Sequence, residues 1–277
     1  MIVCVAQPPF NKADPRLDKI IDWEIKSLEG CDSSIDLIVL PEEIEFNDQK
    51  NDEVKQTGLL DKCAQTARRC NAIVCANAKR PAGKGLRNTT FIFDRSGNLA
   101  GKYYKQHLTP KETTYLDSSY TYEYEPVTIV TIDGIRFAFL TCYDFYFYEY
   151  FGCIALEKPD IIIGCSLQRT DPHNIIRLIT QYCAYNTNAY VVRSSVSLGE
   201  DSDVGGCSMV VSPDSSILLD MGNNVGMATV EIDPKKKYYK SGGFGNPPCS
   251  HFEYMEKGRR PWKYRPAGPG GLYGEQH

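Results

Sequence analysis

The sequence predicts one α/β domain in which helices cover layers of β-strands. The 277 residues are 42% hydrophobic and 24% charged, which is ordinary for a folded protein of this length. Short apolar runs alternate along the chain with longer amphipathic segments. No Gly-rich linker separates the two halves, so we expect a single domain over residues 1–240.

Strands and helices alternate through the first half of the chain. Short apolar runs predict strands at residues 2–6, 36–40, 73–78 and 90–93, and residues 101–104 form the end of a further predicted strand. Two helices are expected at 16–28 and 51–70, and the first has its apolar residues at helical spacing. Asp94 to Asn98 have the composition of a hairpin turn.

The second half repeats this scheme. Strands are expected at residues 127–132, 135–141, 160–164, 189–194, 206–212, 216–220 and 225–232. Helices are expected at residues 146–157 and 173–187. Every predicted helix thus lies between predicted strands, as in an α/β fold.

The chain changes character after Lys240. Residues 241–277 are rich in Gly, Pro, Arg and Tyr, a composition that does not form a regular core element. Aromatic and Arg side chains in residues 258–269 have no local core, and such residues are favoured at interfaces. We expect a C-terminal arm that contacts a second copy in a homodimer or larger homo-oligomer; the alternative is a partly disordered end.

Composition argues against several classes of protein. The net charge of −4 argues against a nucleic-acid binder, and no apolar run of about 18 residues predicts a membrane span. The apolar start, residues 1–6, lacks the basic region of a signal peptide, so we expect a cytoplasmic protein. Eleven cysteines without a Cys-x-x-Cys pair and only four histidines predict free thiols, with no metal or other cofactor.

Three polar residues lie at the ends of predicted strands, which is where ligands bind in open α/β sheets. They are Glu42, Lys105 and Cys142. A thiolate can attack a carbonyl carbon, a carboxylate can move the thiol proton, and an ammonium can stabilise the oxyanion. Taken singly, each has an ordinary alternative: a solvated carboxylate, a surface lysine and a core thiol.

The segments around these residues resemble the nitrilase superfamily over about residues 1–235. They are Asp36-Leu-Ile-Val-Leu-Pro-Glu42, Tyr104-Lys-Gln-His-Leu108 and Thr141-Cys-Tyr-Asp144, in the family's order. The resemblance implies a four-layer α-β-β-α sandwich. It also implies catalysis by Glu42 as general base, Lys105 as cationic stabiliser and Cys142 as nucleophile.

Many members of that family have a second glutamate near the lysine. Glu112, in Leu108-Thr-Pro-Lys-Glu112, is our candidate, and Glu123 and Glu125 remain open. The chain departs from the amidase-like members at Tyr146 and Tyr148, where Arg and Pro are common. The pocket is therefore expected to be unusual.

Three residues are candidates for substrate binding. Tyr143 and Tyr146 are three apart and can share one face of a helix that starts beside Cys142. Arg169 follows a predicted strand and could pair with a substrate carboxylate. The alternatives are core or interface packing for the tyrosines and a surface salt bridge for Arg169.

These residues predict a hydrolase that cleaves an amide or N-carbamoyl group of a small molecule through a Cys142 thioester. The Tyr143-Asp144 pair after the cysteine favours this reaction over a nitrilase, which more often has Trp and Glu there. A catalytically silent interaction protein on the same scaffold is a third hypothesis, and the complete set of Glu, Lys and Cys argues against it.

Removal of the arm tests the expected assembly. Truncation after Ser241 should lower the molar mass measured by light scattering, because interface residues are lost. An unchanged mass would contradict a role of the arm in assembly.

Overall fold

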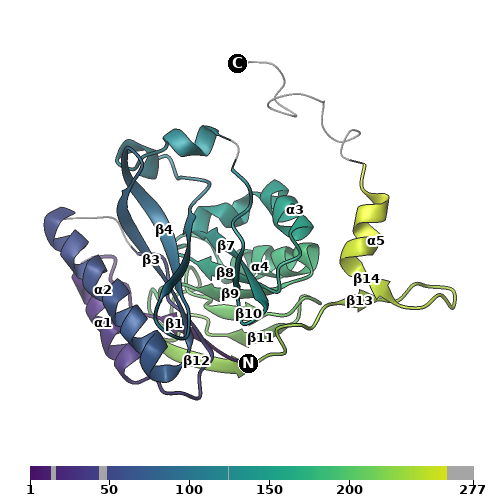
Figure 1. The fold of residues 1–277 in the computed structure, drawn as a ribbon, viewed down its shortest axis with the longest axis horizontal. Helices are drawn as coiled ribbons and strands as arrows, with labels where there is room; N and C mark the ends of the chain where they lie inside the picture. The colour runs from purple at the N-terminus through teal and green to yellow at the C-terminus, as the bar shows by residue number, and fades with distance from the viewer. Residues whose placement is uncertain (14–16, 44–48, 124, 261–277) are drawn as a thin grey trace. The chain divides into compact units, whose positions relative to one another are not determined.

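The computed structural model (Figure 1) describes the chain apart from four segments: 14–16, 44–48, 124 and 261–277. Its internal contacts divide the chain into two units, Met1–Lys236 and Lys237–His277. The larger unit contains the three segments that carry Glu42, Lys105 and Cys142.

Two six-stranded sheets form the larger unit. The first has the order β12-β1-β2-β3-β4-β5, from Gly226–Glu231, Ile2–Gln7, Leu37–Val39, Ile73–Ala82, Gly85–Phe93 and Leu99–Tyr104. The second has the order β11-β10-β9-β8-β7-β6, from Ile217–Asp220, Met209–Val211, Tyr190–Ser194, Ile161–Cys165, Ile135–Thr141 and Val130–Ile132. In each sheet three neighbouring strands are parallel: β1, β2 and β3 in one, β7, β8 and β9 in the other.

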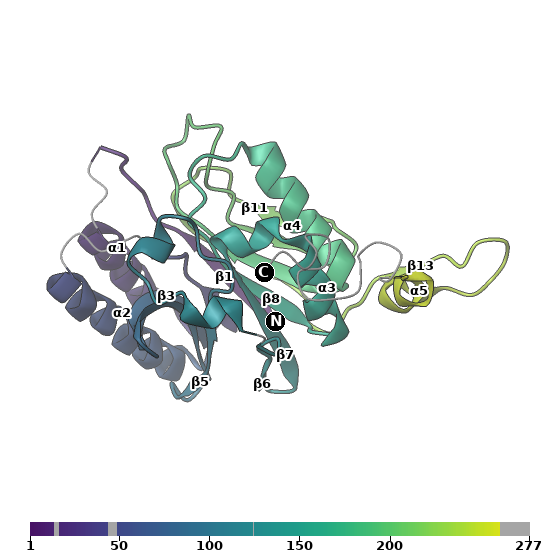
Figure 2. The ribbon, with the colours of Figure 1, turned by 90° about the horizontal axis from the view of Figure 1, so that it is seen from above.

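Helices cover the outer faces of both sheets (Figures 1 and 2). The first sheet packs against α1 (Leu17–Glu29) and α2 (Gln49–Cys70), and the second against α3 (Tyr148–Leu156) and α4 (His173–Thr187). A third apolar cluster lies between the sheets. The predicted four-layer α-β-β-α sandwich is thus confirmed.

Side-chain alternation along the strands separates these clusters. In β1, Val3 and Val5 belong to the cluster between the sheets, whereas Cys4 and Ala6 face α1 and α2. Because both faces are buried, the parallel strands are continuous apolar runs.

The β3–β4 hairpin is longer than predicted. Strands were expected at residues 73–78 and 90–93, but pairing continues to Ala82 and Gly85 around a turn with Gly83 at φ +61°. Buried Lys79 and Asn88 interrupt the apolar pattern in this stretch, and both belong to the polar site described below.

The helix expected at residues 146–157 starts two residues later than predicted and ends one residue earlier. A 3-10 helix, η3 (Cys142–Tyr146), follows β7 directly, and α3 begins only at Tyr148. Two more 3-10 helices, η1 (Glu112–Thr114) and η2 (Ser119–Tyr122), lie between β5 and β6. The α4 helix begins and ends at the predicted residues, His173 and Thr187.

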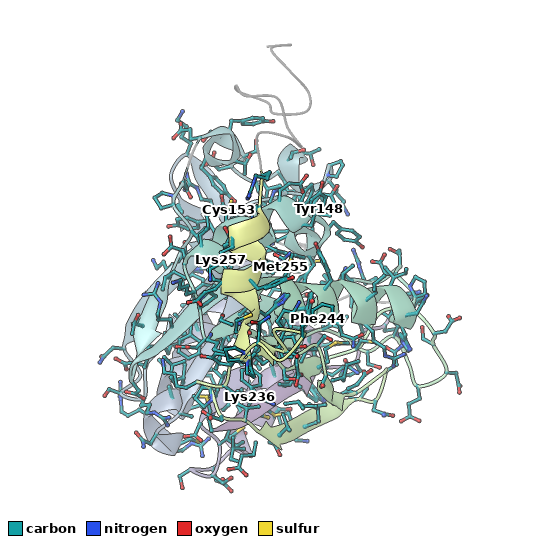
Figure 3. The ribbon with its side chains drawn as sticks, turned by 90° about the vertical axis from the view of Figure 1, so that its right-hand side faces the viewer. Tyr148, Cys153, Lys236, Phe244, Met255 and Lys257 are labelled. Atoms are coloured by element: carbon teal, nitrogen blue, oxygen red, sulfur yellow. The ribbon has the colours of Figure 1, made fainter. Side chains whose placement is uncertain are left out.

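The smaller unit has regular structure where none was expected. It contains β13 (Tyr239–Lys240), β14 (Cys249–Ser250) and α5 (His251–Gly258). Figure 3 shows Met255 on α5 and Phe244 in the loop between β13 and β14. The helix can form because residues 251–257 contain neither Gly nor Pro.

Most of the expected interface segment, residues 258–269, lies outside the described residues, so the oligomeric assembly stays a prediction. Within the described ranges, every helix is too short or too polar to cross a lipid bilayer.

Candidate active site

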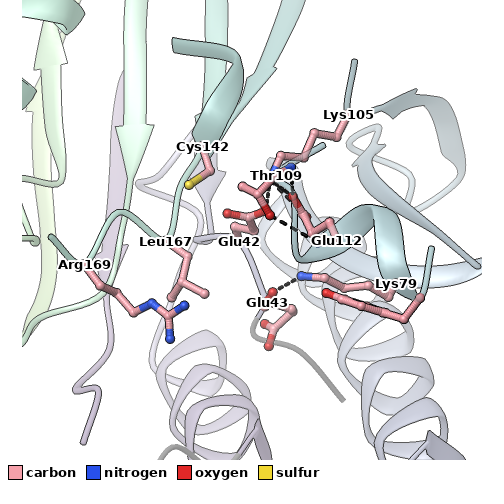
Figure 4. Close-up of a pocket in the computed structure, with 10 residues that line it drawn as sticks. Glu42, Glu43, Lys79, Lys105, Thr109, Glu112, Cys142, Leu167 and Arg169 are labelled. Atoms are coloured by element: carbon pink, nitrogen blue, oxygen red, sulfur yellow. Dashed lines mark hydrogen bonds and ion pairs between the residues drawn. The ribbon is translucent and has the colours of Figure 1, made fainter. Parts of the chain in front are cut away.

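Glu42, Lys105 and Cys142 line one cavity of about 90 Å³ (Figure 4). Glu42 follows β2 in the first sheet, Lys105 follows β5 at the edge of that sheet, and Cys142 follows β7 in the second sheet. The face-to-face packing of the sheets therefore brings together strand ends that are far apart in sequence. Glu112, on η1, lines the same cavity.

Lys105 lies between two carboxylates. Its Nζ is 2.9 Å from Glu42 Oε1 and 3.0 and 2.8 Å from the two carboxylate oxygens of Glu112. All three side chains are almost fully buried. The structure thus selects Glu112 among the three candidate glutamates as the partner of Lys105, since Glu123 and Glu125 are not among the cavity-lining residues.

Amide donors complete this cluster. Asn88 Nδ2 donates to Glu42 Oε1 at 2.7 Å and to Glu112 Oε1 at 2.8 Å. Asn77 Nδ2 in turn donates to Asn88 Oδ1 at 2.7 Å, which fixes the orientation of that amide. The backbone N–H of Thr109 donates to Glu112 at 2.9 Å. Both carboxylates are therefore held in place before any ligand arrives.

Cys142 has an unusual backbone conformation. Its φ is +46°, in the left-handed region that a non-glycine residue adopts at some energetic cost. The turn is held by Asp144, whose Oδ2 accepts the Thr141 N–H at 2.7 Å. This sharp strand-to-helix turn places the thiol in the cavity.

Asp144 also connects the cysteine turn to the segment after Lys105. Its Oδ2 accepts the Tyr103 hydroxyl at 2.8 Å, and its Oδ1 accepts the His107 backbone N–H at 2.9 Å and lies 2.8 Å from His107 Nδ1. The His107 ring stacks on Phe147 with centroids 3.8 Å apart. One buried carboxylate thus fixes the positions of the nucleophile turn and the lysine segment relative to each other.

Burial and neighbouring charges shift the pKa values of Cys142, Lys105 and Glu112. Burial raises the pKa of the Cys142 thiol, and the Glu42 carboxylate raises it further against the opposing effect of Lys105. Burial alone would lower the pKa of Lys105, but Glu42, Cys142 and Glu112 together raise it well above its usual value. Burial is likewise outweighed at Glu112, whose pKa is lowered by Lys105 and Lys79. Burial and the neighbouring charges therefore favour the neutral form of the Cys142 thiol and the charged form of Lys105.

A second pair of acidic groups adjoins the cavity. Glu43 lines it, and its side chain meets that of Glu24 from α1, with both groups fully buried. Burial raises the pKa of Glu43 to about 7, and burial together with Glu43 raises the pKa of Glu24 well above its usual value. No described donor outside the pair reaches their four carboxyl oxygens, and two carboxyl groups can bond to each other only when one of them keeps a proton.

The predicted substrate-binding residues lie in different places. Arg169 lines the cavity, and its guanidinium carbon is 5.3 Å from the centroid of the Phe10 ring. Tyr143 and Tyr146 do share a face, with ring centroids 5.5 Å apart, but neither lines the cavity. Tyr146 lies in an apolar pocket beside α3 and α4 and donates its hydroxyl to Asp171. Substrate contact by the two tyrosines stays a prediction.

Sequence reasoning missed Asn88, Lys79 and Glu24. Asn88 and Lys79 are polar residues inside a hairpin, where Asn and Lys are depleted, and that depletion was a usable signal. Glu24 lies in an amphipathic helix and gave no comparable signal. Among the described residues, no group of three or more His, Cys, Asp or Glu side chains is arranged to hold a metal ion.

A family model and a curated protein both match this chain over most of its length. The family model described as carbon-nitrogen hydrolase matches residues 5–237. The hydrolase in agr operon of Staphylococcus aureus is 22% identical over 234 residues, covering 81% of this chain and 87% of that protein.

Solved amidase structures share the fold. An amidase from Nesterenkonia sp. superposes with a TM-score of 0.68 at 20% identity, covering 84% of this chain and 90% of that one. A variant of the amidase from Nesterenkonia sp. AN1 carries the acetamide moiety of fluoroacetamide at its active-site cysteine. It superposes with a TM-score of 0.70 at 18% identity, covering 95% of both chains.

Replacement of Asp144 by Asn tests its positioning role. An amide can accept at only one of its two polar atoms, so Thr141 N–H or His107 N–H loses its acceptor. We expect the free energy of unfolding to fall by about 2 kcal/mol and turnover to fall with it, measured by thermal unfolding and a rate assay. Asp94→Asn is the control, because Asp94 accepts backbone N–H groups in an exposed turn. Equal effects of the two variants would contradict the special role of Asp144.

The Glu24–Glu43 pair should make stability depend on pH. Both groups bind protons more tightly in the folded protein, so their stabilising contribution is complete below about pH 4.5 and is lost as pH rises through 7. Glu24→Gln removes one of the two titrating groups. The free energy of unfolding of this variant, minus that of wild type, should therefore increase by roughly 1–3 kcal/mol between pH 5 and 8, as measured by chemical unfolding.

Glu29→Gln on the same helix is the control. The hydrogen bond between Glu29 and Lys62 lowers the pKa of Glu29, so Glu29 titrates below the range from pH 5 to 8. If wild type and Glu24→Gln kept a constant stability difference from pH 5 to 8, the buried pair would not titrate there.

Proposed function

The chain belongs to the carbon-nitrogen hydrolase family, and on that premise we propose that it hydrolyses an amide or N-carbamoyl group of a small molecule. Cys142 forms a thioester, Glu42 transfers protons, and Lys105 stabilises the oxyanion. The observation that carries the proposal is the buried Lys105 ammonium, fixed between Glu42 and Glu112 in the cavity that also contains Cys142.

Thioester formation needs a base because burial and the Glu42 carboxylate raise the pKa of the Cys142 thiol and so favour its neutral form. Glu42 accepts the thiol proton as sulfur attacks the amide carbon, and the carbonyl π electrons move to oxygen. The charge of Lys105 stabilises the resulting tetrahedral oxyanion. Collapse of this intermediate breaks the carbon–nitrogen bond, and the proton on Glu42 leaves with the amine as ammonia.

Hydrolysis of the thioester reuses the same groups. Glu42 accepts a proton from water as the oxygen attacks the thioester carbon, and Lys105 again stabilises the oxyanion. The carbon–sulfur bond then breaks, the proton returns to sulfur, and the carboxylic acid departs. The net reaction consumes one water and releases ammonia and an acid.

Glu112 acts through Lys105 in this scheme. Its two oxygens accept from the ammonium at 2.8 and 3.0 Å, so it fixes the position of the charge. It also balances the charge of Lys105 while Glu42 is protonated. Glu112 is thus assigned a positioning role next to the general base.

Three substitutions test the roles together. Cys142→Ala should abolish turnover, because every step passes through the thioester. Glu42→Gln keeps its shape but cannot accept a proton, and we expect kcat to fall about 10²–10⁴-fold. Lys105→Met removes the oxyanion charge, and a loss of about 10²-fold or more is expected.

The assay is ammonia release from short amides, N-carbamoyl amino acids and the matching nitriles, with thermal unfolding to confirm that each variant is folded. Near wild-type kcat in any variant would contradict its assigned role. Ammonia release from the nitriles but not from the amides would favour the nitrilase reaction.

A further inference from the structure

One buried arginine has no part in the proposed reaction. Arg193 lies near the end of β9, and its side chain is fully buried. Its Nη1 donates to the backbone carbonyls of Gly206 and Cys207 at 2.9 and 2.7 Å, and its Nη2 donates to Gln168 Oε1 at 2.6 Å. These partners are neutral oxygens, and Arg193 Nε has no partner among the atoms that the structure describes. Burying a guanidinium among neutral groups costs free energy, so packing alone does not explain an arginine at this position.

Gln168 belongs to a loop that forms one wall of the active-site cavity. The loop, residues 166–172, connects β8 to α4. Leu167 and Arg169, on either side of Gln168, both line the cavity, and Figure 4 shows them on one side of it. The side chain of Gln168 is instead bound to Arg193. Arg193 therefore anchors this wall through the residue between the two that face the cavity.

The same loop contacts the nucleophile and the general base. Burial and the Glu42 carboxylate raise the pKa of the Cys142 thiol. Lys105 and a hydrogen bond from the Leu167 backbone to the sulfur lower this pKa. The Ser166 carbonyl accepts the Glu42 backbone N–H at 3.3 Å. A small shift of the loop would therefore weaken the bond to the sulfur, because hydrogen bonds weaken steeply as their geometry departs from ideal.

We propose that Arg193 is a positioning residue that acts on the nucleophile through Gln168. The anchored loop keeps the Leu167 N–H directed at the Cys142 sulfur. Negative charge develops on this sulfur as Glu42 accepts the thiol proton, and an N–H already aimed at it stabilises that charge without reorganisation. The effect on turnover rests on the proposed function, because the sulfur must attack an amide carbon. The effect on the reactivity of the thiol is measurable without a substrate.

The alternative role of Arg193 is to hold a strained turn. Gly205, Gly206 and Cys207 all have positive φ, at +71°, +57° and +55°. Arg193 binds the carbonyls of the last two. A non-glycine residue with this φ carries an energetic cost, so the turn depends on such contacts. If this were the only role, the bond to Gln168 would be dispensable.

Two substitutions of Gln168 separate these roles. Gln168→Met has a similar length but cannot accept from Arg193, and it leaves both carbonyl contacts of the arginine in place. Gln168→Glu retains an acceptor oxygen for Arg193. The loop stays attached in either variant, because Asp171 still accepts the Tyr146 hydroxyl. Thermal unfolding confirms that both variants are folded.

The reactivity of Cys142 is measured with methyl methanethiosulfonate, a small thiol reagent that is not an amide, and each cysteine is followed by peptide mass spectrometry. We expect Gln168→Met to slow the labelling of Cys142 about 3- to 10-fold, because the lost hydrogen bond leaves less thiolate. Gln168→Glu should retain most of the wild-type rate. The exposed Cys153 is the internal reference and should react equally in all variants. Gln181→Met is the matched control, because this side chain donates to a backbone carbonyl between β10 and β11 and should leave both rates unchanged.

Ammonia release connects this positioning role with the proposed reaction. The kcat for an amide should fall about 10-fold in Gln168→Met and recover in Gln168→Glu, with a smaller change in KM, because the N–H acts on charge that develops during attack. Slower labelling in Gln168→Met that Gln168→Glu restores, without any ammonia release by the wild type, would overturn the proposed reaction but not the positioning role. A wild-type rate of labelling or a wild-type kcat in Gln168→Met would overturn the positioning role, and so would equal losses in the two variants.

Discussion

The buried ion cluster of Lys105, Glu42 and Glu112 is the constraint on which the rest of the site depends. Three charged groups removed from water are tolerated only if their hydrogen bonds are satisfied. Asn88 and the Thr109 backbone supply the remaining donors, and Asn77 orients Asn88. The polar residues within the β3–β4 hairpin therefore follow from the need to hold this cluster.

The sandwich makes the cluster possible because it brings strand ends from two sheets to one cavity. The apolar layer between the sheets fixes the distance between β2 and β7, and hence between Glu42 and Cys142. Asp144 then connects the cysteine turn to the segment after Lys105 through bonds to both. The strained φ of Cys142 is maintained by this framework, since its neighbours are fixed on either side.

Much of this arrangement could be predicted from sequence. Glu42, Lys105 and Cys142 each follow a predicted strand, and that position indicated a site. Other features depend on tertiary contacts that a linear pattern does not contain. Glu24 belongs to an amphipathic helix, and only the packing of α1 against the segment after β2 reveals its pairing with Glu43. Tyr146 is the last residue of a 3-10 helix, not the first of the expected α-helix, and it lines the apolar pocket beside α3 and α4.

The most direct test of the account is site-resolved labelling of the eleven cysteines by fluoroacetamide, followed by peptide mass spectrometry. Reactivity governed by exposure alone would favour Cys153, which is exposed, over Cys142, which is only partly accessible and has a raised pKa. A cavity that binds the amide next to Cys142 predicts preferential labelling of Cys142, with that preference lost in Lys105→Met. Labelling of Cys153 with Cys142 left unmodified would contradict the assignment of Cys142 as the nucleophile.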